Sequence, residues 1–185
     1  MRRSVLVSLA LAVIVPLGCG GGGGDDNSGN ITNPNLACTA TTNGTFSATL
    51  NGQAWVACGQ VTVRNDVSFL SAKDTLRTVS WAGSGFLPGN VAYAIVMSAS
   101  KLNGGGITPG TYAVGLVTPT NSNFIAGNSN NAGWAASPTG GSGSITITSF
   151  TNNHITGTFT FDAAPTTGTA SGTLQVRSGK IDLSF

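Results

Sequence analysis

Residues 46–57 read FSATLNGQAWVA, and this stretch decides the fold class. Apolar and polar side chains alternate on both sides of Asn51-Gly52, a dipeptide typical of a tight type I′ turn because both positions accept a positive φ. A two-residue turn there sets Ala48 opposite Trp55. We therefore predict a β-hairpin, and its buried face is predicted to carry Phe46, Ala48, Leu50, Trp55 and Ala57.

A second hairpin is predicted over residues 144–161, where four apolar side chains alternate with polar ones. A two-residue turn at Asn152-Asn153 would place the apolar side chains of the two strands on opposite faces. A three-residue loop that ends at His154 places them all on one face. Burial selects this second register, because a slip by one residue inverts every side chain. The four side chains belong to Ile145, Ile147, Phe159 and Phe161.

Short runs of the same kind recur along the chain, and no segment has the period of an amphipathic helix. Residues 118–132 are predicted to form a long loop, with turns at Asn65-Asp66 and Ser178-Gly179. The chain is therefore predicted to be all-β, an antiparallel meander of about ten short strands forming a β-sandwich or a closed β-barrel, with a calycin-like barrel as the alternative. The further strands are predicted at Gln60–Arg64, Ser68–Ala72, Leu76–Trp81, Asn90–Ala99, Gly110–Val117, Gly133–Ala136, Gly172–Arg177 and Gly179–Phe185.

The N-terminal segment has the features of an export signal. Residues 1–18 begin with a basic Arg2-Arg3 pair, continue in an apolar run over 5–15 and end at a small residue before a cysteine. The run is shorter than the ~20 residues that a membrane-spanning helix needs. Leu17-Gly18-Cys19 resembles a bacterial lipobox, which implies that a lipoprotein signal peptide is removed and that Cys19 carries a lipid anchor with acyl chains such as palmitate.

A stretch rich in Gly and Asn follows over 19–37, and it is predicted to be a flexible tether to an all-β domain over 38–185. The residue after Cys19 is Gly20 rather than Asp, which favours the outer membrane under the sorting logic of bacteria with two membranes. We therefore expect an exported, lipid-anchored protein of the cell envelope.

The charge pattern argues against several partners and chemistries. The chain has 8 Lys and Arg against 6 Asp and Glu, and loss of the signal peptide removes Arg2 and Arg3, so the mature chain is formally neutral. No basic cluster supports a nucleic acid partner. The sequence contains no Glu and no G-x-S-x-G motif, so it is not expected to be an enzyme.

The few side chains that could carry chemistry are scattered. His154 is predicted to sit on an exposed loop, and Asp162 and Asp182, each flanked by core-facing residues, are predicted to point into solvent. Asp66 and Asp74 lack the spacing of a calcium loop. We therefore expect no metal and no cofactor.

Two cysteines remain once Cys19 is lipidated. Cys38 and Cys58 form an even pair in an oxidising compartment, which predicts a disulfide. A metal site or a thiol nucleophile would need a further Cys or a nearby His. The predicted role of the disulfide is structural.

Outward Thr, Ser and Asn side chains predict a non-catalytic binding or structural module. Trp134, beside the predicted loop, is a weak candidate for a ligand-binding anchor, whereas Trp81 and Tyr112 are expected in the core. The expected partners are the membrane, through the lipid anchor, and an unknown protein, glycan or small apolar ligand. The alternatives are a calycin-like carrier of a small apolar ligand and, less in keeping with the composition, an envelope enzyme.

Collinear motifs run along the predicted domain, namely Phe46-x-Ala48-x-Leu50-Asn51-Gly52-x-x-Trp55-x-Ala57, Ile107-Thr108-Pro109-Gly110-Thr111-Tyr112, Gly143-x-x-x-Ile147, Ile155-x-Gly157-x-Phe159-x-Phe161 and Val176-x-Ser178-Gly179-x-Ile181-Asp182-Leu183-x-Phe185. Over about residues 44–185 the chain resembles a family of uncharacterised bacterial lipoproteins that is catalogued as a domain of unknown function. The resemblance implies an exported all-β domain and brings no catalytic residues. The cysteine pair and Ile181 depart from the family pattern.

Overall fold

The computed structural model describes residues 41–69, 74–103, 105–115 and 120–185. These residues form ten strands and no helix, which confirms the all-β prediction, and within these ranges no helix has the length and apolarity needed to cross a membrane. The predicted signal peptide and tether lie outside the described residues. The strands are β1 (Gly44–Leu50), β2 (Gln53–Phe69), β3 (Thr75–Leu87), β4 (Val91–Leu102), β5 (Gly110–Ala113), β6 (Thr120–Asn128), β7 (Ala132–Ala136), β8 (Ser142–Phe150), β9 (His154–Gly168) and β10 (Leu174–Ser184).

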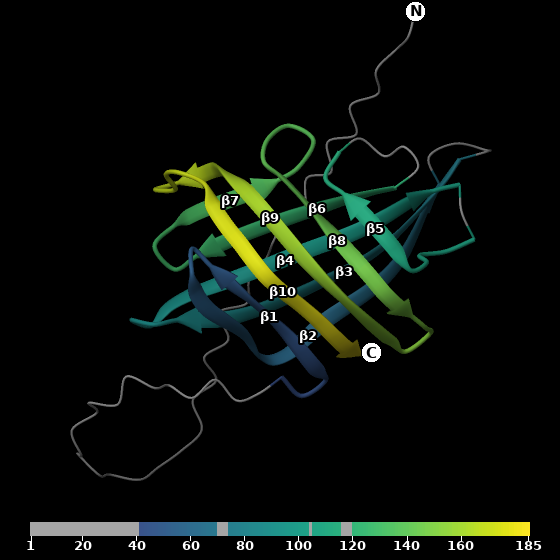
Figure 1. The fold of residues 1–185 in the computed structure, drawn as a ribbon, viewed down its shortest axis with the longest axis horizontal. Coiled ribbons are helices and arrows are strands. Elements are labelled where there is room, and N and C mark those ends of the chain that lie inside the picture. The colour runs from purple at the N-terminus through teal and green to yellow at the C-terminus, as the bar shows by residue number, and fades with distance from the viewer. Residues whose placement is uncertain (1–40, 70–73, 104, 116–119) are drawn as a thin grey trace, which may run out of the picture. The chain divides into compact units, whose positions relative to one another are not determined.

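Eight of the strands close into a ring. Their order is β10-β1-β2-β3-β4-β6-β7-β9, and β9 pairs back with β10 (Figure 1). β8 pairs with β9 outside the ring, and β5 pairs with β8. Closure removes the open strand edges at which other chains can add. The remaining edge falls on β5, which is only four residues long.

The ring is folded into two layers because β2 and β9 each belong to both. Residues 53–56 of β2 pair with β1, and residues 57–69 pair with β3. Residues 154–163 of β9 pair with β10 and β8, and residues 164–168 pair with β7. Figure 1 shows β1, β10, β9, β8 and β5 crossing over β3, β4 and β6. We call β1, β10, β8, β5 and residues 154–163 of β9 the front layer. We call β3, β4, β6 and β7, with the parts of β2 and β9 that pair with them, the rear layer.

Large apolar side chains fill the space between the layers. Phe124 of the rear layer stacks on Phe161 of the front layer with ring centroids 4.9 Å apart, and Phe46 meets the edge of Trp55 at 5.2 Å. In the first hairpin Ala48 pairs with Trp55, and all five residues of the predicted buried face lie in the core. The prediction from residues 46–57 is therefore confirmed.

The second hairpin confirms the predicted shared face and corrects the predicted loop. All four apolar side chains are buried together. However, Thr151 N donates to His154 O at 2.8 Å, so the turn is the two-residue Asn152-Asn153 and not a three-residue loop. A β-bulge at Thr148 supplies the extra residue that brings the strands back into phase. His154 therefore begins β9 instead of occupying a loop tip.

Three further predictions of irregular structure are wrong. The predicted turn at Asn65-Asp66 lies inside β2, where both residues pair with β3. The predicted turn at Ser178-Gly179 is a bulge within the continuous strand β10. The predicted loop over 118–132 contains β6, which pairs with β4 through most of its length. In each case a paired neighbour strand outweighs the weak strand propensity of Asn, Asp, Ser and Gly.

Candidate functional site

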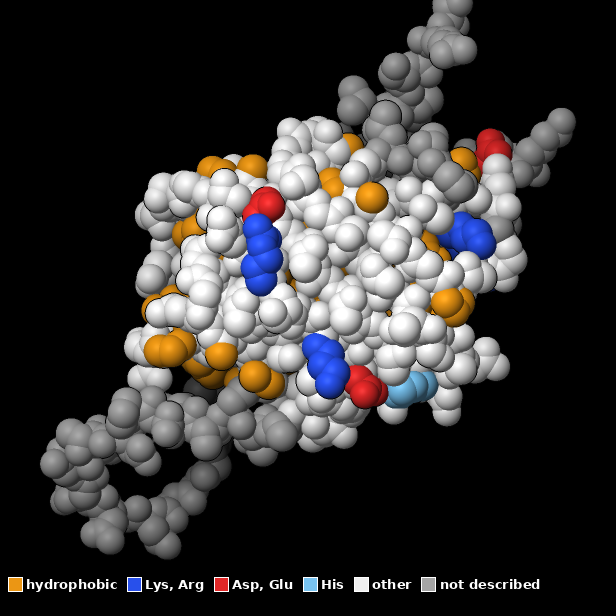
Figure 2. Space-filling view, in the orientation of Figure 1, with side chains coloured by type: hydrophobic (Ala, Val, Ile, Leu, Met, Phe, Trp, Pro, Cys, Tyr) orange, Lys and Arg blue, Asp and Glu red, His pale blue; other side chains and the backbone are white. Residues whose placement is uncertain are grey.

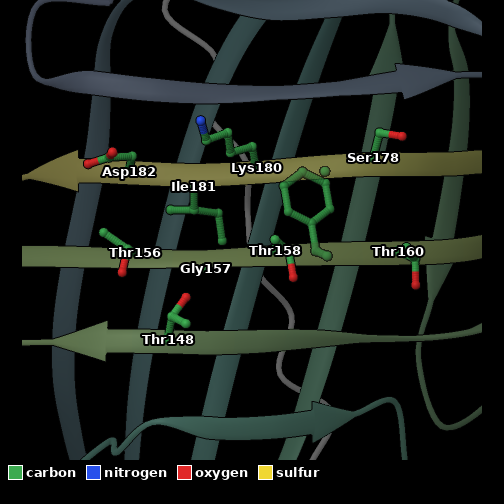
Figure 3. A pocket seen from close by; sticks show the side chains of 11 residues that line it. Thr148, Thr156, Gly157, Thr158, Thr160, Ser178, Lys180, Ile181 and Asp182 are labelled. Atoms are coloured by element: carbon green, nitrogen blue, oxygen red, sulfur yellow. The ribbon is translucent and has the colours of Figure 1, made fainter.

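A groove of about 390 Å³ lies on the outer face of the front layer, over β8, β9 and β10. Figure 3 shows Thr156, Thr158 and Thr160 in a row, with Lys180 and Asp182 on the neighbouring strand. The groove is open rather than enclosed, so it suits an extended ligand. Its lining residues are Thr148, Thr156, Gly157, Thr158, Phe159, Thr160, Ser178, Gly179, Lys180, Ile181 and Asp182.

The threonines face outward because apolar residues of the same strand face inward. Ile155, Phe159 and Phe161 of β9 are buried, so the alternate positions point into solvent. These outward side chains continue across the layer in a cross-strand row, in which the hydroxyls of Thr111 and Thr146 are 3.1 Å apart. The row runs from β5 to β1 through Thr111, Thr146, Thr158, Lys180 and Ser47.

Two β-bulges border the groove and supply part of its lining. Thr148 is the extra residue of β8, and Ser178 lies in the bulge of β10 with a φ of 51°. A bulge raises the local twist of a sheet and redirects the side chain of the extra residue. Gly179, next to Ser178, has no side chain, and a Cβ there would collide with the Phe159 ring. The bulges and this close packing give the otherwise regular front layer its hollow.

Charged side chains stand at two points of this face. His154 Nε2 lies 2.9 Å from Asp182 Oδ1, and Arg177 contacts Asp162 while its Nη1 donates to Phe161 O at 2.8 Å. Both ion pairs are partly exposed. Figure 2 shows these charges as small groups on a face that is mostly uncharged, with a further Lys or Arg and an Asp at its right-hand end. Asp162 and Asp182 point outward as predicted, and each carboxylate lies beside a basic side chain, Arg177 and His154 respectively.

Most of the exposed lining of the groove is apolar, and hydroxyls, one ammonium and one carboxylate border it. In the part of the chain that the structure describes, no three His, Cys, Asp or Glu side chains cluster so as to hold a metal ion.

Two of the cysteines with predicted roles lie outside the described residues. Cys19, the predicted lipidation site, and Cys38 both belong to residues 1–40. Cys58 lies in β2 opposite Ser84 of β3. Lipidation and the Cys38–Cys58 disulfide therefore remain predictions.

Trp134 lies on the inward face of β7 and is only 8% exposed. Its ring stacks on Tyr93 with centroids 6.2 Å apart, and its Nε1 donates to Gly172 O at 3.2 Å. Little of the ring is left for a ligand. Trp81 and Tyr112 are buried, which confirms their predicted place in the core.

Sequence reasoning missed the groove as a site, and one signal could have found it. The run from Thr156 to Thr160 places three threonines two residues apart, which puts them on one face of any strand. The contribution of Thr148 and Ser178 depends on bulges, and nothing in the local pattern marks a bulge there.

Comparison with known proteins finds a match between part of the chain and a family model to which no activity is assigned. Residues 95–181 match the model of a family described as a domain of unknown function, DUF6252. The match begins within β4 and ends within β10, and it includes every residue that lines the groove except Asp182. No curated protein and no solved structure matches the chain.

Proposed function

We propose that this protein is a lipid-anchored bacterial envelope protein, exported and held at the outer membrane by Cys19, whose all-β domain is a non-catalytic module that binds an envelope glycan in the front groove. The observation that carries the proposal is the groove itself, which Thr148 and Ser178 line at two bulges beside a row of outward threonines. A polymer of sugars presents hydroxyls along its length, and these match an open, hydroxyl-lined surface through donors and acceptors.

The filled interior favours this reading over a calycin-like carrier. A carrier needs space between the layers, and there Trp55, Trp81 and Phe124 are each at most 1% exposed and belong to one continuous core.

The experiment is cosedimentation of the purified full-length protein with peptidoglycan sacculi. The test variant is Thr158→Val, which keeps a β-branched side chain of similar size and removes one hydroxyl from the centre of the groove. We expect its binding to weaken about 5- to 10-fold, which is the effect of one lost hydrogen bond. The matched control is Thr62→Val, at an exposed position of β2 that pairs with Ala82 of the rear layer, and it should bind like wild type.

Equal binding by both variants would show that the groove is not the binding site. Absence of wild-type sedimentation would show that peptidoglycan is not the ligand.

The lipid anchor at Cys19 has a separate test. Incorporation of alkyne-palmitate into the wild-type chain but not into Cys19→Ser is the expected result, and labelling of the variant would contradict it.

A further inference from the structure

Two cations lie side by side at one end of the space between the layers. Arg77 of β3 and Lys101 of β4 are direct cross-strand partners. They share the face of their strands with Val79 and Ala99, which are fully buried, so both side chains start from the inward face of the rear layer. The opposition of two like charges on neighbouring strands destabilises a sheet. Their juxtaposition therefore calls for a compensating group.

No carboxylate among the described residues supplies that compensation. Asp182 and Asp162 lie beside His154 and Arg177 in the front layer, and Asp74 accepts from Asn103 Nδ2 at 2.8 Å. The Nε of Arg77 is buried and makes no hydrogen bond within the described structure, although the guanidinium is a group of five donors. Burial of a charged donor without a partner is costly.

The surroundings of the two cations are ordered and rich in donors. Lys101 Nζ donates to Thr108 Oγ1 at 3.3 Å. Thr108 is itself fixed by Tyr112, whose hydroxyl accepts from Thr108 N at 3.1 Å and donates to Thr108 O at 2.8 Å. Ser122 of β6 lies diagonally across from Lys101 on the same inward face, and its buried Oγ has no partner among the described residues.

We propose that this end of the ring binds the oxyanion of a phosphate group between Arg77 and Lys101, with the Ser122 hydroxyl as a further donor. The guanidinium presents parallel N–H groups that match two oxygens of a phosphate, and an ammonium contributes a compact charge. A bound phosphate replaces the repulsion between the two cations by two attractions. The site is independent of the groove on the front layer.

The test is the thermal unfolding of the purified full-length protein in inorganic phosphate and in chloride at equal ionic strength and pH. A ligand that binds the folded state raises the Tm, and we expect a rise of about 3–5 °C in phosphate. Arg77→Gln and Lys101→Gln should each abolish the phosphate-dependent rise. Either substitution also relieves the repulsion, so these variants are expected to remain folded in chloride. Lys180→Gln, in the front groove, is the control and should keep the rise.

A second probe distinguishes a free phosphate from a lipid headgroup. Dihexanoyl phosphatidylglycerol below its critical micelle concentration carries a phosphodiester, and a Tm rise with it that depends on Arg77 identifies a headgroup site. A rise with inorganic phosphate alone identifies a site for free phosphate or a monoester. The proposal is overturned if neither probe raises the wild-type Tm, or if Arg77→Gln and Lys101→Gln keep the rise.

Discussion

Two outward cross-strand rows, one on each layer, differ in chemistry although one closed sheet forms both layers. On the rear layer a cross-strand row over β3, β4, β6, β7 and β9 consists of Ala82, Val96, Ile125, Ala135 and Ala164. On the front layer the corresponding row from β5 to β1 carries three threonines, a lysine and a serine. The inward residues of both layers are mostly apolar, and the exceptions Arg77, Lys101 and Ser122 lie at one end of the rear layer. Burial of the apolar side chains therefore determines which positions of each strand point outward. It does not determine the residue types at those positions, so the two outer faces can differ in chemistry.

The largest expected effect tests the shared interior that both faces depend on. Phe161→Ala removes the ring that stacks on Phe124 across the two layers. We expect the free energy of unfolding to fall by about 3–5 kcal/mol, as for other buried aromatic side chains. Thr160→Ala, one residue away on the outward face, should change it by less than about 0.5 kcal/mol. Denaturant unfolding measures both values. Similar losses for the two variants would show that the layers do not share one core.

A smaller effect is expected on the rear face. Ile125 is 41% exposed, and its partners on either side are Val96 and Ala135. Ile125→Thr keeps the β-branched shape and gives the rear face one residue of the front-face type. The substitution replaces a partly exposed ethyl group by a hydroxyl, and a fully buried methylene is worth ~0.8 kcal/mol, so we expect a loss of about 0.5–1 kcal/mol in the free energy of unfolding. A loss above about 2 kcal/mol would mean that the rear face is covered rather than exposed.

The smallest expected effect on the free energy of unfolding concerns the bulge of β10 in the front layer. Ser178 adopts a φ of 51°, a left-handed conformation that costs a residue with a Cβ about 1 kcal/mol relative to Gly. Ser178→Gly relieves this strain but adds freedom to the unfolded chain. The net expectation is a gain of about 0.5 kcal/mol in the free energy of unfolding, measured against wild type by denaturant titration. A clear loss would show that the Ser178 side chain stabilises the bulge.

The fold class and the core were accessible from the sequence because alternation is a local property. Phe46, Trp55 and Phe159 face inward as their period predicts. At residues 152–154 the predicted shared face was correct and the predicted three-residue loop was wrong. A two-residue turn together with a bulge at Thr148 produces the same shared face. Bulges depend on pairing with a strand that is distant in sequence, and so does the inclusion of β6 in the sheet. The Arg77–Lys101 pair and the contribution of Thr148 and Ser178 to the groove follow from such pairings and could not be derived from local patterns.

The closure of the ring through β1 and β10 has a consequence for the order of folding. These strands pair from Gly44 with Leu183, and Asn43 Nδ2 donates to Ser184 O across 141 positions of sequence at 3.0 Å. A chain that lacks its last strand leaves β1 and β9 each without a neighbour that the ring provides. Contacts so distant in sequence form late, because the loop that they close is long. The ring therefore cannot close before β10 has been synthesised.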